Sequence, residues 1–101
     1  MTDTTTLTRL RAMRELLSAP ERWTQGSFAE DDDRFEVEPR GPFACRWCMW
    51  GGWMKCGGRY GDQELREVVA VDDVVGFNDT HTHAEVLALI DGAIAKMEGQ
   101  C

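Results

Sequence analysis

Three cysteines lie within a span of twelve residues, in the stretch CRWCMWGGWMKCGG that covers residues 45–58. Cys45 and Cys48 are separated by two residues, which is the spacing of a zinc knuckle, and Cys56 follows after seven more. A tetrahedral zinc site needs four ligands, and the residues left to supply the fourth are His81, His83 and Cys101. The chain has no second Cys-x2-Cys pair, so a small zinc-binding module that uses Cys45, Cys48, Cys56 and a histidine is the second hypothesis.

The second kind of chemistry that residues 45–58 could support is catalysis by a nucleophilic cysteine thiol. We expect Cys48 in the first turn of a helix, where the helix dipole lowers the pKa of a thiol. His81 or His83 would then act as the base, and Asn78 or Asp79 would orient it. A cysteine-dependent hydrolase is the third hypothesis, because both histidines flank a helix cap and are expected at the surface.

Packing explains the same residue types without any ligand and is the leading interpretation. Reduced cysteine behaves as a small hydrophobe, and Gly51 and Gly52 would let a neighbouring element come close. Trp47, Trp50 and Trp53 bring large apolar areas, and three indoles at this spacing cannot all point in one direction. We therefore expect Trp50 or Trp53 to be partly exposed and to serve as a contact anchor for a partner.

The elements that must position these residues are predicted mainly as helices. Apolar residues at three- and four-residue steps predict a helix over 4–18, and the segment 23–40 reads as a short hairpin around an acidic turn. The remaining predictions are a helix over 44–57, a helix over 62–75, a loop over 76–83, and a last helix that Thr82 and Glu85 begin with a capping box. Phe43, Trp47, Trp50 and Met54 are predicted to line one face of the helix over 44–57.

These predictions define the fold class as mainly α (α+β), with about four helices and a short β-hairpin between the first and the second. The 101 residues are expected to form a single compact domain, 1–101. Gln25 and Asn78 are expected to be buried polar side chains that tie the hairpin and the loop before the last helix to the core.

The composition narrows the classes of partner. The net charge is −7, and no cluster of lysine and arginine is present, so we expect no general nucleic-acid binding. An acidic surface suits a basic partner. The chain has no apolar run near the roughly 18 residues of a membrane span and no signal-peptide pattern, so no membrane association and a cytoplasmic location are expected.

Four short motifs resemble those of a family of small bacterial and bacteriophage proteins known only as a domain of unknown function. The motifs are a Trp-x-Gln-Gly segment, a Cys-x-x-Gly helix, a Phe/Trp-Asn-Asp loop and a capped final helix. The matching residues are Trp23, Gln25, Gly26, Cys48, Gly51, Phe77, Asn78 and Asp79. The resemblance implies a compact, mainly helical domain and no established activity, and Cys45 and Cys56 lie outside its pattern.

Together, the charge and the resemblance favour a non-enzymatic protein that binds another macromolecule. We expect a protein partner, either a host protein that a phage or bacterial chain contacts or inhibits, as in evasion of a host defence, or a second copy in a homodimer. No catalytic residue, metal ligand or cofactor is assigned. The predicted binding residues are Trp50, Trp53, Trp23, Gln25, Asn78 and Asp79.

Overall fold

The computed structural model describes residues 4–99, and its secondary structure is mostly helical. The described residues form five α-helices: α1 (Thr4–Leu16), α2 (Met49–Lys55), α3 (Gln63–Val69), α4 (Val74–Thr80) and α5 (His83–Glu98). A 3-10 helix, η1 (Pro20–Arg22), and two short strands, β1 (Ala29–Glu30) and β2 (Arg46–Trp47), lie between α1 and α2. The predicted class is confirmed: the chain is mainly α, with a small antiparallel hairpin between its first two helices.

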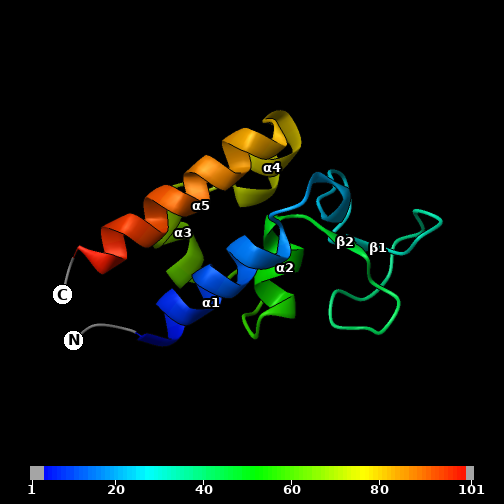
Figure 1. Cartoon of the computed structure of the whole chain (residues 1–101), viewed down its shortest axis with the longest axis horizontal. Helices are drawn as coiled ribbons and strands as arrows, with labels where there is room; N and C mark the ends of the chain where they lie inside the picture. The colour runs from blue at the N-terminus through cyan, green and yellow to red at the C-terminus, as the bar shows by residue number, and fades with distance from the viewer. Residues whose placement is uncertain (1–3, 100–101) are drawn as a thin grey trace.

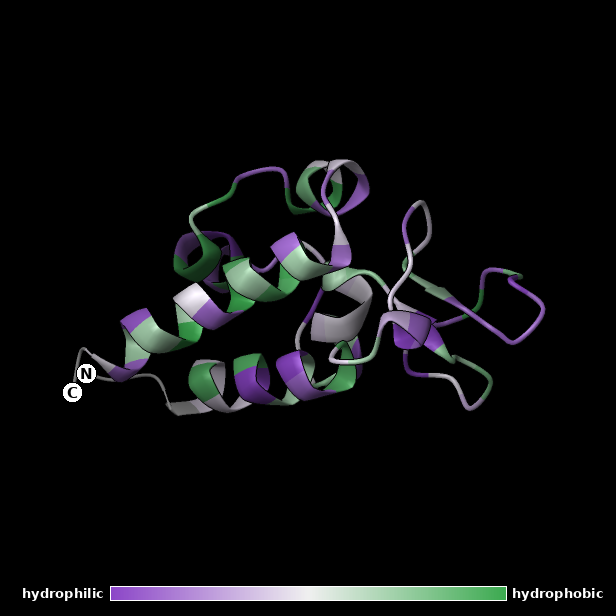
Figure 2. Cartoon of the chain, turned by 45° about the horizontal axis from the view of Figure 1, so that its top comes forward, coloured by the Kyte–Doolittle hydropathy of each residue, from purple (hydrophilic) through white to green (hydrophobic). Residues whose placement is uncertain are grey.

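The two long helices, α1 and α5, pack side by side in antiparallel directions at one end of the molecule (Figure 1). Their apolar stripes face each other, as the green faces in Figure 2 show. The buried residues of these stripes are Leu7, Leu10, Met13, Val86, Ile90, Ala93 and Met97. The three- and four-residue spacing of apolar residues therefore predicted correctly which faces of α1 and α5 are buried.

The capping box that begins α5 is confirmed. Oγ1 of Thr82 accepts a hydrogen bond from the Glu85 N–H at 3.1 Å, and Oε1 of Glu85 accepts one from the Thr82 N–H at 2.8 Å. Both partners satisfy backbone donors that a helix start leaves without a partner inside the helix. Gly99 ends the helix, as predicted.

Short helix α2 lies in the middle of the molecule and packs against α1 and α4. A Cβ atom at Gly52 would lie 3.2 Å from Cγ of Met13, so the absence of a side chain there lets α1 approach. Helix α3 packs against α5 and completes the core with buried Leu65 and Val69.

The prediction of a helix over 44–57 is wrong at its start. Arg46 and Trp47 form β2, with Ala29 opposite Trp47 and Glu30 opposite Arg46, and helix α2 begins only at Met49. The Cys45 N–H donates to the Glu30 carbonyl at 2.8 Å. Pairing with this distant segment satisfies backbone groups that the predicted first turn would have used. Phe43, placed on a helix face by the prediction, lies in the preceding loop and is 73% exposed.

The prediction of a loop over 76–83 is also wrong for most of its length. Helix α4 runs through Gly76 and Asn78, two residues that disfavour helix interiors. Asp73 caps its start, because Oδ1 of Asp73 accepts a hydrogen bond from the Gly76 N–H at 2.9 Å. The predicted helix over 62–75 is confirmed for α3 and ends at Val69.

Among residues 4–99, no helix is both long and apolar enough to cross a membrane.

Candidate functional site

A buried asparagine joins three segments that lie far apart in the sequence. Oδ1 of Asn78 accepts hydrogen bonds from the Trp23 indole N–H at 2.8 Å and from the Met49 backbone N–H at 3.1 Å. Its Nδ2 group donates to the Thr24 carbonyl at 3.0 Å and to Oδ1 of Asp79 at 3.2 Å. The amide thus uses all four of its hydrogen-bonding positions, which offsets the cost of burying it in a helix.

Gln25 and Gly26, which follow Trp23 closely in the sequence, form hydrogen bonds with α4 at the protein surface. Nε2 of Gln25 donates to the carbonyls of Asn78 and His81, both at 3.0 Å, at the C-terminal end of α4. The Gly26 N–H donates to Oδ1 of Asp79 at 3.0 Å, and Gly26 has a φ of +84°, which a residue with a side chain adopts only with strain. Gln25 therefore ties the two segments together as predicted, but it does so as an exposed side chain, and its predicted burial is wrong.

Cys48 occupies the N-cap position of α2. Its Sγ atom accepts a hydrogen bond from the Gly51 N–H at 3.4 Å, and its own N–H donates to the Phe28 carbonyl at 3.2 Å. A Cβ atom at Gly51 would lie only 1.7 Å from that same carbonyl oxygen. The Cys-x-x-Gly motif therefore has two structural roles: the thiol of Cys48 caps the start of α2, and Gly51 allows a close contact that only glycine permits.

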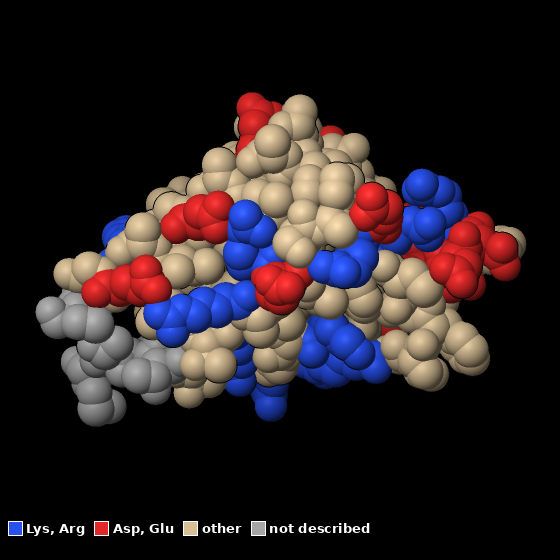
Figure 3. Space-filling view, in the orientation of Figure 1, with Lys and Arg blue, Asp and Glu red and all other residues tan. Residues whose placement is uncertain are grey.

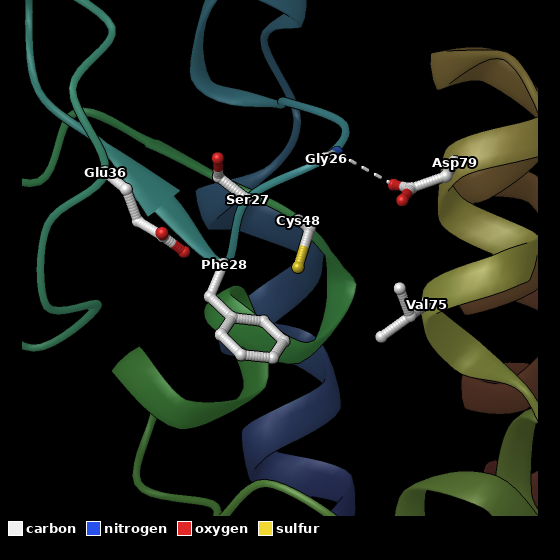
Figure 4. Close-up of a pocket in the computed structure, with 7 residues that line it drawn as sticks. All are labelled: Gly26, Ser27, Phe28, Glu36, Cys48, Val75 and Asp79. Atoms are coloured by element: carbon white, nitrogen blue, oxygen red, sulfur yellow. Dashed lines mark hydrogen bonds between the residues drawn. The ribbon is translucent and has the colours of Figure 1, made fainter.

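A pocket opens between the loop at Gly26, the start of α2 and the side of α4 (Figure 4). Its volume is about 120 Å³, and it is lined by Gly26, Ser27, Phe28, Glu36, Cys48, Val75 and Asp79. In Figure 4 the carboxylates of Glu36 and Asp79 come from opposite sides, and the thiol of Cys48 points into the space between Phe28 and Val75. Gly26, Cys48 and Asp79, three of the residues that carry the family resemblance, thus meet at one cavity.

The thiol at this pocket is not activated. Burial is the largest influence on Cys48 and raises its pKa from 9.0 to about 11, although N–H groups at the start of α2 act in the opposite direction. Neither histidine lines the pocket. The His81 ring stacks on Phe77, with centroids 3.7 Å apart, and Nε2 of His83 lies 2.6 Å from the Leu17 carbonyl oxygen. The lowered thiol pKa that the hydrolase hypothesis requires is therefore not found at Cys48, and neither His81 nor His83 lines the pocket with it.

The cysteines of the zinc hypothesis have separate environments. Cys48 is buried, Cys56 is half-buried, and Cys45 lies beside Asp32, whose hydrogen bond raises the pKa of the Cys45 thiol. Within residues 4–99, no three histidine, cysteine, aspartate or glutamate side chains are grouped so that they could hold a metal ion. Cys101 lies outside the described residues.

The expected exposure of Trp50 or Trp53 is wrong. Trp50 is 2% exposed and Trp53 is 0% exposed, because segments distant in the sequence cover both rings. The Trp53 indole N–H donates to Oδ2 of Asp62 at 2.9 Å, and the Arg66 guanidinium lies over the Trp50 ring, 5.6 Å from its centroid. Of the predicted binding residues, Trp23, Gln25, Asn78 and Asp79 come together, while Trp50 and Trp53 belong to the core.

Large apolar side chains are exposed elsewhere. Phe35 is 69% exposed, Phe43 is 73% exposed and Tyr60 is 57% exposed. Phe35 and Phe43 lie in the loops between β1 and β2, which project from the helices (Figure 1). Their neighbours in the sequence, an aspartate run before Phe35 and a Gly-Pro pair before Phe43, are turn formers, and this is the signal that would have placed them in loops.

The fold and these contacts define a small, mainly helical protein in which a Trp-x-Gln-Gly loop, a Cys-x-x-Gly helix start and an Asn-Asp pair are bonded to one another. The chain belongs to the family of unknown function DUF6197, whose model matches residues 1–96. No curated protein and no solved structure matches the chain.

Proposed function

We propose that this chain binds another protein through the loops between β1 and β2, residues 31–45, which we call the loop surface. The observation that carries the proposal is the presence of two strongly exposed phenylalanines, Phe35 and Phe43, on this one short stretch. Single exposed apolar residues are ordinary on protein surfaces, but aromatic side chains that are buried on association supply much of the binding energy at interfaces.

The backbone of the loop surface is held in place before any partner arrives. Oδ1 of Asp31 accepts hydrogen bonds from the Asp33 and Phe35 N–H groups, at 2.9 and 3.0 Å. Arg40 donates to the Met54 carbonyl at 2.9 Å, and the Trp47 indole N–H donates to the Pro39 carbonyl at 3.0 Å. A preorganised loop loses less conformational entropy on binding, which favours a role in recognition.

The charge of the loop surface favours a basic partner. Five acidic residues and two basic ones lie within residues 31–45, and acidic side chains gather at this end of the molecule in Figure 3. Arginines pair with acids in both regions: Nε of Arg14 lies 2.7 Å from Oδ1 of Asp91 between α1 and α5, and Nη1 of Arg34 in the loop surface lies 3.8 Å from Oε1 of Glu30. Complementary charge speeds encounter and selects among partners. More specifically, we propose that the protein partner belongs to a host cell and that binding of this chain inhibits it.

The experiment that tests the proposal compares three forms of the chain as affinity baits. The bound proteins are identified by mass spectrometry, and the affinity of a captured protein is then measured with purified material. The double variant Phe35→Ser/Phe43→Ser is expected to lose at least about tenfold in affinity, because both anchors are removed. Tyr60→Ser is the matched control, since Tyr60 is an exposed aromatic outside the loop surface.

The two outcomes are distinct. Binding that survives in Tyr60→Ser, weakens in the double variant and decreases with added salt supports the loop surface as the interface. Unchanged binding in a double variant with a native circular dichroism spectrum overturns it. Light scattering over a range of concentrations decides whether a second copy of the chain is the partner.

A further inference from the structure

The pocket beside Cys48 is of a size that suits one side chain. Its volume is about 120 Å³. Pockets for drug-sized ligands usually enclose about 300–1,000 Å³, whereas an engineered cavity of about 150 Å³ holds a benzene molecule. A nucleotide or similar cofactor is therefore too large to be held within this pocket, and a chain of several heavy atoms fits it.

The lining combines an apolar wall with two carboxylates. Phe28, Val75 and the thiol of Cys48 supply the wall, and the thiol stays neutral because burial raises the pKa of Cys48 to about 11. Glu36 and Asp79 supply the negative charge, and no lysine or arginine is among the residues that line the cavity. The wall suits a hydrocarbon stem, and the carboxylates suit a cationic head at its end.

Among the described residues, the hydrogen bonds accepted by the Asp79 carboxylate all go to Oδ1, which leaves Oδ2 available for a ligand. Oδ1 of Asp79 already accepts hydrogen bonds from the Gly26 N–H and from Nδ2 of Asn78, at 3.0 and 3.2 Å. These bonds fix the carboxylate, and Figure 4 shows it at the edge of the pocket with its bond from Gly26. Glu36 faces it from the other side and is itself a loop-surface residue, next to Phe35, so the pocket and the loop surface share this side chain.

We propose that the pocket binds the side chain of a lysine or arginine of the protein partner. The stem would pack between Phe28 and Val75, and the charged head would lie between the carboxylates of Glu36 and Asp79. Lysine and arginine have this combination of an apolar stem and a charged end, whereas an acidic side chain would be repelled. The inference rests on the proposed function, because it names the feature of the partner that the site recognises.

The test uses small probes and does not require a known partner. Nα-acetyl-lysine N-methylamide and its arginine counterpart are titrated into the ¹⁵N-labelled chain, and amide chemical shifts are followed. Shifts centred on Gly26, Ser27 and Val75, with saturation at millimolar concentrations, are expected. The norleucine counterpart, which keeps the stem and lacks the charge, is expected to bind about threefold more weakly, which lies within the range for an exposed ion pair.

A matched pair of variants localises the charge effect. Glu36→Gln is expected to weaken binding of the lysine probe about threefold. Glu38→Gln is the control and is expected to leave binding unchanged, because Glu38 is an exposed acidic residue two positions away that does not line the pocket. The inference is overturned if norleucine binds as well as lysine, if the two variants behave alike, or if no shift appears at these residues.

Failure of this inference can be told apart from failure of the proposed function. If the affinity for a captured protein depends on Phe35 and Phe43 but not on Glu36, the loop surface stands and the pocket inference falls. If the probes bind at the pocket and the loop variants have no effect on any captured protein, the cation site stands and the loop surface falls.

Discussion

The indole N–H of Trp23 donates a hydrogen bond to Oδ1 of Asn78 at 2.8 Å, across 55 residues of sequence. The same oxygen accepts from the Met49 N–H, and Nδ2 of Asn78 donates to the Thr24 carbonyl. One side chain thus connects the segment after η1, the start of α2 and the interior of α4. Its replacement affects all three at once.

Replacing Asn78 with alanine is expected to lower the free energy of unfolding by about 3 kcal/mol or more. Each buried group left without a partner costs about 1–3 kcal/mol, and the substitution leaves at least the Trp23 and Met49 donors unpaired. Urea denaturation followed by circular dichroism measures the change. Lys96→Ala, at an exposed position in α5, serves as the control and is expected to stay within about 0.5 kcal/mol of the native chain. A loss below about 1 kcal/mol for Asn78→Ala would contradict the described network.

Two glycines inside helices are expected to respond to alanine in opposite ways. Gly51→Ala would place a Cβ atom 1.7 Å from the Phe28 carbonyl oxygen, so we expect a loss of at least about 3 kcal/mol or failure to fold. Gly92→Ala, in α5, meets no atom within 4 Å and is expected to gain about 0.5–1 kcal/mol from helix propensity. Thermal melting of both variants tests the pair, and equal effects would rule out the close approach at Gly51.

The capping role of Cys48 can be separated from its volume. Cys48→Ser keeps an acceptor for the Gly51 N–H, whereas Cys48→Val keeps apolar volume and has none. Serine is among the best N-cap residues and valine among the worst, so the serine variant is expected to be about 1 kcal/mol more stable. Denaturant unfolding of the two proteins measures the difference. A more stable valine variant would mean that filling the space matters more than capping α2.

The stability of the protein is expected to fall at alkaline pH because of Cys48. Burial raises the pKa of this thiol in the folded chain from 9.0 to about 11, so the folded state opposes thiolate formation. The stabilising contribution is complete below pH 9 and is lost as the pH rises through 11, with a limit of about 2–3 kcal/mol. Unfolding experiments from pH 8 to pH 11 should show a steeper decline in the native chain than in Cys48→Ser. The same raised pKa predicts slow alkylation of Cys48 by iodoacetamide at neutral pH, and fast alkylation in the folded protein would contradict it.

Local signals in the sequence were sufficient for the parts of the fold that depend on near neighbours. The three-residue spacing of Thr82 and Glu85 predicted the capping box, and the apolar stripes predicted α1 and α5. Gln25 and Asn78 were expected to tie the hairpin to the segment before the last helix, and hydrogen bonds join these two segments, but the partners of each side chain were not predicted.

Features that depend on distant segments could not be predicted in this way. Arg46 and Trp47 have helix-like neighbours, but they pair with Ala29 and Glu30, about 17 positions earlier. Trp53 is buried because Asp62 accepts its N–H and the Arg9 guanidinium lies 5.8 Å from its ring centroid. The spacing of residues within α2 does not indicate these contacts with other segments. The prediction that Trp50 or Trp53 is exposed was therefore wrong.

The supports of the loop surface have a consequence for how proteins with this fold could diverge. Its backbone is fixed by Asp31, Arg40 and Trp47, while the tips that carry Phe35 and Phe43 have little part in the core. Substitutions of the exposed Phe35 and Phe43 side chains are therefore expected to cost little folding stability. The fold can then exchange one binding specificity for another while its helices stay unchanged, and loop libraries at Phe35 and Phe43 that keep Arg34 (φ +67°) and Gly41 are a direct route to new binders.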